Sequence, residues 1–114
     1  MAEAKPGETL ILSWTPNGHL NNAKPTKVDI LYYAEPGKEF GTYGEAQSAP
    51  KAATLDFATN ANCKKPEDAG HPCTGQLKVP DNLKPGNTYS FVWFWHFNSN
   101  GAEEYTTCFD IKIV

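Results

Sequence analysis

A tyrosine-containing turn at residues 83–89 limits the folds open to this chain. Leu83, Pro85, Gly86 and Tyr89 have the spacing Leu-x-Pro-Gly-x-x-Tyr. β-Sandwiches use this spacing at a corner, where the Tyr hydroxyl hydrogen-bonds to upstream backbone as a long strand begins. The spacing therefore predicts packed β-sheets and a long strand that starts at Tyr89.

Residues 89–97 (YSFVWFWHF) have the pattern of a central strand. One face carries Tyr89, Phe91, Trp93, Trp95 and Phe97, and the other carries Ser90, Val92, Phe94 and His96. Because both faces are mostly apolar, we expect this strand to be covered on both sides. Asn100-Gly101 then lies in the connection to a last strand at residues 104–114, which gives a hairpin.

Glycine and proline divide the rest of the chain into short segments. The 114 residues include nine Gly and nine Pro, which leaves little room for long helices. Further strands are predicted at residues 8–14, 27–34, 53–58 and 75–79, and a long surface loop at residues 38–51. The expected fold is all-β: an immunoglobulin- or fibronectin III-like antiparallel β-sandwich of about 6–8 strands. It forms a single domain over residues 1–114, with a flexible N-terminal segment at residues 1–7.

Charge and hydropathy exclude several classes of partner. Ten Lys, no Arg and 13 acidic residues give a net charge of -3, so no basic surface is expected for nucleic acid. No apolar run approaches the ~20 residues that a membrane helix needs. We therefore expect neither nucleic acid nor a membrane as a partner. The oligomeric state stays open, because residues 38–51 or an uncovered edge strand could mediate association.

The cysteines indicate the cellular compartment. Cys63 and Cys73 flank a Pro- and Gly-rich loop, and closing this loop with a disulfide would suit a secreted protein. Residues 1–5 lack the apolar centre of a signal peptide, so we expect secretion with the native leader removed. Three cysteines cannot all pair within one chain. Cys108 is therefore either a buried thiol or the partner of a cysteine outside this sequence.

Histidines and acids give weak catalytic signals. His19, His71 and His96 do not have the spacing of a zinc site. His19 follows a strand in an Asn-Gly turn, where an imidazole would be exposed and able to coordinate, whereas His96 is expected to be a hydrogen-bonded structural residue. Glu103 and Glu104 would point to opposite faces of a strand, which argues against hydrolysis by paired carboxylates. No nucleophile elbow or phosphate-binding loop is present.

Aromatic residues are the remaining candidates for a binding site. Flat rings offer apolar faces on which the C–H groups of a sugar ring can stack. Trp93 and Trp95 are expected in the core. Tyr33, Tyr43 and Tyr105 are expected at the surface, so these three tyrosines are the candidate carbohydrate-binding residues.

Four segments in the final third resemble the closing strands of lytic polysaccharide monooxygenases and related chitin-binding proteins. They are GQLKVP (75–80), PGNTY (85–89), VWFW (92–95) and EYTTCFDI (104–111). The first predicted strand ends at Trp14 and is followed by His19. This arrangement resembles the place where that family carries the second histidine of its copper site.

The resemblance implies a partial copper site. His19 would be the second ligand, Tyr105 the axial position and Glu104 a neighbouring group that tunes the metal. The chain begins Met1-Ala2 and so lacks the amino-terminal His that supplies two of the three copper-binding nitrogens in the family. The family also often ties its C-terminal Cys to an upstream one. This pattern, with the spacing, leads us to expect a Cys63–Cys73 pair and a free thiol at Cys108.

We therefore expect a secreted, non-catalytic relative of these monooxygenases that binds a polysaccharide such as chitin or cellulose, or a cell-wall glycan. Two alternatives remain. The chain could be the core of a copper-dependent polysaccharide monooxygenase whose N-terminal ligand is missing from this sequence. It could also be a fibronectin-like interaction or adhesion module with no small ligand, because the tyrosine corner is common to many sandwiches.

Overall fold

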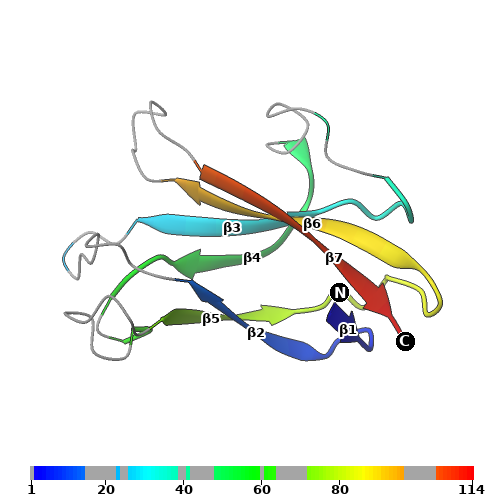
Figure 1. Ribbon diagram of the computed structural model, residues 1–114, viewed down its shortest axis with the longest axis horizontal. Helices are drawn as coiled ribbons and strands as arrows, with labels where there is room; N and C mark the ends of the chain where they lie inside the picture. Colours follow the sequence, from blue (N-terminus) through cyan, green and yellow to red (C-terminus); the bar gives the residue numbers. More distant parts are fainter. Residues whose placement is uncertain are drawn as a thin grey trace.

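The computed structural model describes residues 2–14, 23, 26–38, 41, 48–59, 61–63, 72–96 and 105–114. These residues form seven β-strands (Figure 1). The strands are β1 (Ala2–Ala4), β2 (Thr9–Trp14), β3 (Lys27–Tyr32), β4 (Lys51–Asp56), β5 (Cys73–Lys78), β6 (Thr88–His96) and β7 (Tyr105–Ile113). The predicted all-β class is confirmed. A search of the same residues for a helix able to cross a membrane finds none.

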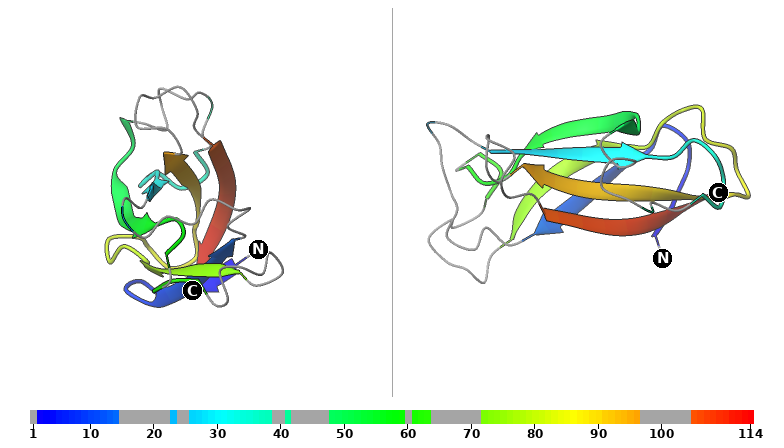
Figure 2. Two further views of the ribbon diagram at one scale, coloured as in Figure 1. Left: turned by 90° about the vertical axis from the view of Figure 1, so that its left-hand side faces the viewer. Right: turned by 90° about the horizontal axis from the view of Figure 1, so that it is seen from above.

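The strands form two sheets. Five of them make a mixed, curled sheet in the order β1-β7-β6-β3-β4, and β2 and β5 make a separate antiparallel pair. Figure 2 shows the larger sheet arching over this pair. β4 packs against β5 on one side, whereas β2 and β7 are not paired with each other on the other. The described strands thus form a half-barrel that opens between β2 and β7.

The central position of β6 is confirmed. This strand lies between β3 and β7, and side chains on both of its faces are buried. The buried residues are Tyr89, Phe91 and Trp95 on the inner face and Ser90, Val92 and Phe94 on the outer face. The inner face contributes to the main core between the sheets. On the outer face, Leu31 joins Val92 and Phe94 in a smaller cluster, against which Ala49 packs.

The tyrosine corner is present as predicted. The backbone N–H of Lys84 donates a hydrogen bond of 3.0 Å to the hydroxyl of Tyr89, which is 2% exposed. Gly86 has a φ of 90°, a conformation that favours glycine. Its N–H donates to the carbonyl of Ile113 at 2.7 Å, so the turn is fixed to the end of β7. The turn therefore holds the start of β6 to the end of its neighbour.

The N-terminal residues differ from the expectation of a flexible segment at 1–7. Ala2–Ala4 form β1, which pairs in parallel with Ile111–Ile113 of β7, and Ala4 is buried. Three residues that include two alanines carry no strand signal of their own, so this pairing depends on the edge that β7 offers. The parallel pair also makes the larger sheet mixed rather than antiparallel throughout.

Candidate functional site

Three aromatic rings form a stack at one end of the half-barrel. Phe57 lies just after β4, and its ring lies 3.7 Å from that of Trp95 with an interplanar angle of 8°. Trp95 in turn stacks on Tyr105 at 5.3 Å and 29°. Phe57 and Trp95 are 1% and 6% exposed, whereas Tyr105 is 50% exposed. The stack therefore presents one rigidly supported aromatic ring to solvent.

Hydrogen bonds hold the inner rings of this stack in place. The indole N–H of Trp95 donates to the hydroxyl of Thr26 at 2.9 Å. The backbone N–H of Phe57 donates to the carbonyl of Thr26 at 2.9 Å. The indole N–H of Trp14 donates to the carbonyl of Phe57 at 2.8 Å. Because buried donors lose stability when they are unpaired, these bonds fix the orientation of the indoles.

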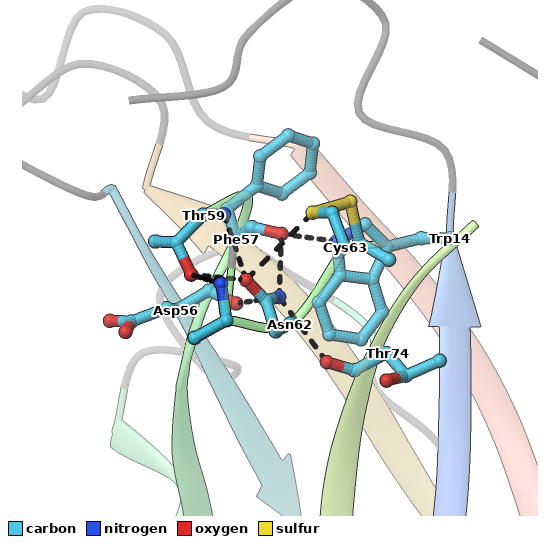
Figure 3. Close-up of a disulfide and its surroundings, with 9 residues drawn as sticks. Trp14, Asp56, Phe57, Thr59, Asn62, Cys63 and Thr74 are labelled. Atoms are coloured by element: carbon cyan, nitrogen blue, oxygen red, sulfur yellow. Dashed lines mark hydrogen bonds between the residues drawn. A yellow bond between two sulfur atoms is a disulfide. The ribbon is translucent and has the colours of Figure 1, made fainter. Parts of the chain in front are cut away.

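The predicted disulfide lies near Trp14 and Phe57 (Figure 3). Cys63 and Cys73 are bonded, and both are buried. Next to them, the side chain of Asn62 accepts hydrogen bonds from the N–H and hydroxyl of Thr59 at 2.8 and 2.7 Å. Its amide group donates to the carbonyls of Phe57 and Thr74, each at 3.2 Å. Asn62 and the disulfide thus join the end of β4 to the start of β5.

The roles of Phe57 and Asn62 were not predicted. Phe57 falls within the predicted strand at 53–58, but periodicity alone does not say which distant ring it meets. Asn62 precedes Cys63 in a polar stretch, where asparagine is a common turn residue. A hint was available in Thr59, which lies three residues earlier, because Thr and Asn side chains often bond to nearby backbone.

A groove opens between β2 and β7 next to the stack. It has a volume of about 220 Å³ and is mostly apolar. Its lining residues are Leu12, Ser13, Trp14, Trp93, Thr107 and Phe109. Trp93, which was expected in the core, is half-buried and packs against the main core, and its buried indole nitrogen has no hydrogen-bond partner among the described residues. The groove therefore extends the aromatic surface from the stack into the mouth of the half-barrel.

The structure does not bring Tyr33 and Tyr105 together. The N–H of Tyr33 bonds to the carbonyl of Ser90 near the start of β6, whereas Tyr105 pairs with Trp95 near its end. These points are five residue steps apart on β6, roughly 17 Å along a strand. In addition, the Nζ atom of Lys38 lies 4.6 Å from the centre of the Tyr33 ring. This contact covers one face of Tyr33, so the two tyrosines do not form one binding surface.

The remaining predicted site residues, His19, Tyr43 and Glu104, lie outside the described residues. Of the proposed copper ligands only Tyr105 is therefore placed, and no three His, Cys, Asp or Glu side chains in the described ranges come together as a metal site. A single phenol does not hold a copper ion, so the copper site stays a prediction.

His96 is a hydrogen-bonded residue, as predicted. Its Nε2 atom lies 2.8 Å from Oδ2 of Asp29, which is 7% exposed. The hydroxyl of Thr54 donates to the other carboxylate oxygen of Asp29 at 2.8 Å, and the Nζ atom of Lys51 lies 3.4 Å away. Burial raises the pKa of Asp29, but these hydrogen bonds and the charges of Lys51 and His96 together lower it below 3.8. The buried carboxylate is therefore held in its ionised form.

Cys108 is a free, exposed thiol on β7, so the alternative of a buried thiol is wrong. The position of β7 in the sheet explains why Cys108 is exposed. Cys108 lies opposite Val92 on the outer face of the sheet, but β7 lies nearer the edge than β6. Side chains that cover Val92 do not extend over Cys108, as its exposure shows.

The described part of the chain is thus a β-rich domain with one disulfide and an exposed aromatic stack beside an apolar groove. Residues 41–114 match the family described as Domain of unknown function (DUF7492), and the chain belongs to this family. No curated protein and no solved structure matches the chain. The comparisons do not link it to the polysaccharide monooxygenases, so that relationship stays a hypothesis.

Proposed function

We propose that this protein is a non-catalytic module that binds a polysaccharide such as chitin or cellulose, or a cell-wall glycan, through Tyr105. The supporting observation is the stack of Tyr105 on Trp95 and Phe57. A half-exposed ring that is backed by buried rings loses little conformational freedom when a sugar stacks on it. Its apolar face suits the C–H groups of a pyranose.

The finer fold and the location belong to the same proposal. An immunoglobulin- or fibronectin III-like sandwich is supported by the tyrosine corner at Lys84 and Tyr89. Secretion is supported by the disulfide between Cys63 and Cys73, because disulfides persist in oxidising compartments. A distant relationship to the polysaccharide monooxygenases rests on the four sequence segments alone.

Retention on insoluble chitin and cellulose tests this function. We expect the protein to be retained on at least one of them, and Tyr105→Ala to weaken binding about three- to tenfold through the lost stacking. Tyr105→Phe keeps the ring and should bind like the parent. Tyr33→Ala is the matched control, because its ring lies far from Tyr105 and is covered by Lys38.

The outcomes separate the proposed function from its rivals. No retention on either polymer would contradict binding to chitin or cellulose and favour an interaction module. Retention that is equal in Tyr105→Ala and the parent would place the site elsewhere, and Tyr43→Ala would then be the next variant. Tight one-to-one Cu(II) binding in calorimetry that is lost in His19→Ala would favour the copper-enzyme alternative. A lone imidazole should bind Cu(II) only weakly.

A further inference from the structure

The inner face of β7 leads from the surface into the groove. Alternate residues of a strand point to the same side, so every second residue from the start of β7 belongs to this face. Along it, exposure falls from Tyr105 and Thr107, which are exposed, through half-buried Phe109 to buried Ile111 and Ile113. Thr107 and Phe109 also line the groove. The exposed ring of Tyr105 and the groove are therefore parts of one continuous surface.

This surface combines an aromatic floor with polar borders. Trp14 and Trp93, whose ring centres lie 5.6 Å apart, supply aromatic faces next to Phe109. The borders are strand edges: in the described ranges β2 pairs only with β5, and residues 106–110 of β7 pair only with β6. The backbone groups along such edges can donate and accept hydrogen bonds.

A sugar ring has the matching distribution of chemistry. Its C–H groups form apolar faces that stack on aromatic rings, and its hydroxyls surround the ring and both donate and accept hydrogen bonds. The hydroxyl of Thr107 adds a side-chain partner at the border of the groove. An apolar surface alone would suit many ligands. Aromatic rings flanked by hydrogen-bonding strand edges favour a chain of sugars.

We infer that the glycan site continues from Tyr105 into the groove, so that a linear polysaccharide lies along β7 with one sugar on Tyr105 and further sugars over Phe109 and Trp93. From Tyr105 to Phe109 the strand advances roughly 13 Å, which is longer than one sugar ring. The inference rests on the proposed function and narrows its ligand class. The site binds linear chains of several sugars, and short oligosaccharides fill only part of it.

Soluble oligosaccharides of two lengths test the inference. The probes are chitohexaose and chitobiose, with cellohexaose and cellobiose as the second pair, and dissociation constants are measured by calorimetry. We expect the hexasaccharide of at least one pair to bind the parent about tenfold more tightly than the disaccharide, because a disaccharide on Tyr105 is too short to reach Phe109. Equal affinity for the two lengths would overturn the inference.

Two variants distinguish failure of the inference from failure of the proposed function. Phe109→Leu should reduce the length ratio towards one, because it removes an aromatic ring that only the hexasaccharide reaches. Tyr105→Ala should weaken both lengths. If Tyr105→Ala weakens binding and Phe109→Leu leaves the ratio intact, the groove is not part of the site. If none of the four oligosaccharides binds, both proposals fail.

A measurement on the parent protein covers the case in which Phe109→Leu does not fold. The chain has three tryptophans and so three indole N–H signals in a ¹⁵N spectrum. Trp14 and Trp95 donate to protein acceptors, whereas Trp93 lines the groove and has a buried indole nitrogen with no partner among the described residues. We expect the hexasaccharide to shift the Trp93 signal. An unchanged Trp93 signal at saturation would overturn the inference.

Discussion

The Nε2 atom of His96 lies 2.8 Å from Oδ2 of Asp29, which joins a buried carboxylate on β3 to a partly exposed imidazole on β6. The two residues are neighbours across the β3–β6 pairing, where Asp29 lies opposite Phe94 and Lys27 opposite His96. Thr54 bonds to the same carboxylate from the other side, so Asp29 links three adjacent strands on the outer face of the sheet.

This arrangement predicts how stability depends on pH. Because the pKa of Asp29 in the folded protein lies below 3.8, the folded state favours the ionised carboxylate more than the unfolded state does. The resulting stability is fully present above 3.8 and is lost as the pH falls through the lower, folded-state pKa. Asp29→Asn should be about 1–3 kcal/mol less stable than the parent at neutral pH.

Urea unfolding of Asp29→Asn and the parent across a pH series measures this effect. The difference between the two proteins should shrink as the pH falls below 3.8, because the parent carboxyl then becomes neutral as well. Asp110→Asn is a useful comparison, since Asp110 is an exposed aspartate that bonds to Ser90 on the same face of the sheet. A difference for Asp29→Asn that is constant over the series would contradict the assigned ionisation.

The tyrosine corner predicts that loss of the Tyr89 hydroxyl lowers the free energy of unfolding. Tyr89→Phe keeps the buried ring but leaves the N–H of Lys84 without its acceptor. Removing one partner of a buried hydrogen bond costs about 1–2 kcal/mol, which chemical denaturation can resolve. Tyr105→Phe removes the hydroxyl of a half-exposed side chain and should change stability less. Equal effects of the two substitutions would mean that the Lys84–Tyr89 bond contributes nothing to folding.

The strands and the corner could be predicted because their signals are local. The alternation in β6 and the spacing from Leu83 to Tyr89 each lie within a single short stretch, and the pairing of Cys63 with Cys73 closes a loop of nearby residues. Alternation also predicted correctly that β6 would be covered on both faces, since both sets of its alternate residues are mostly apolar.

The arrangement of the sheets could not be predicted in the same way. β1 forms because the edge of β7 accepts it, and the half-barrel opens because β4 rather than β7 packs against the β2–β5 pair. Both facts depend on long-range packing that periodicity does not encode. The binding residue could not be singled out for the same reason. Tyr33 and Tyr105 look equivalent in sequence, but in the structure Tyr105 stacks on buried Trp95, whereas Lys38 lies over the ring of Tyr33.

Gly75 predicts a second stability effect that the sequence does not reveal. A Cβ atom at this position would lie 2.5 Å from Cδ1 of Leu55 and 2.9 Å from a ring carbon of Trp14. Glycine therefore allows β5 to approach side chains of both β4 and β2. Gly75→Ala should lower the free energy of unfolding by about 1–3 kcal/mol through overpacking.

Thermal unfolding of Gly75→Ala beside Gln76→Ala checks this prediction. Gln76 is the next residue of β5 and is exposed, so its truncation should have little effect. If Leu55 and Trp14 move without cost, Gly75→Ala will unfold with the parent. That result would show that the contact around Gly75 is not tightly packed.

The assigned cysteine pairing predicts both the number of reactive thiols and the stability of cysteine variants. Cys108 is exposed and Cys63 and Cys73 are bonded, so a thiol reagent should titrate one thiol in the native, unreduced protein. Replacing Cys63 and Cys73 together by Ala should cost about 2–3 kcal/mol, because the bond restricts a short loop in the unfolded chain. The loss should extend to the stack, since the disulfide and Asn62 hold the turn that carries Phe57. Cys108→Ser should unfold like the parent, whereas a thiol count of zero in the denatured, unreduced monomer would contradict the assigned pairing.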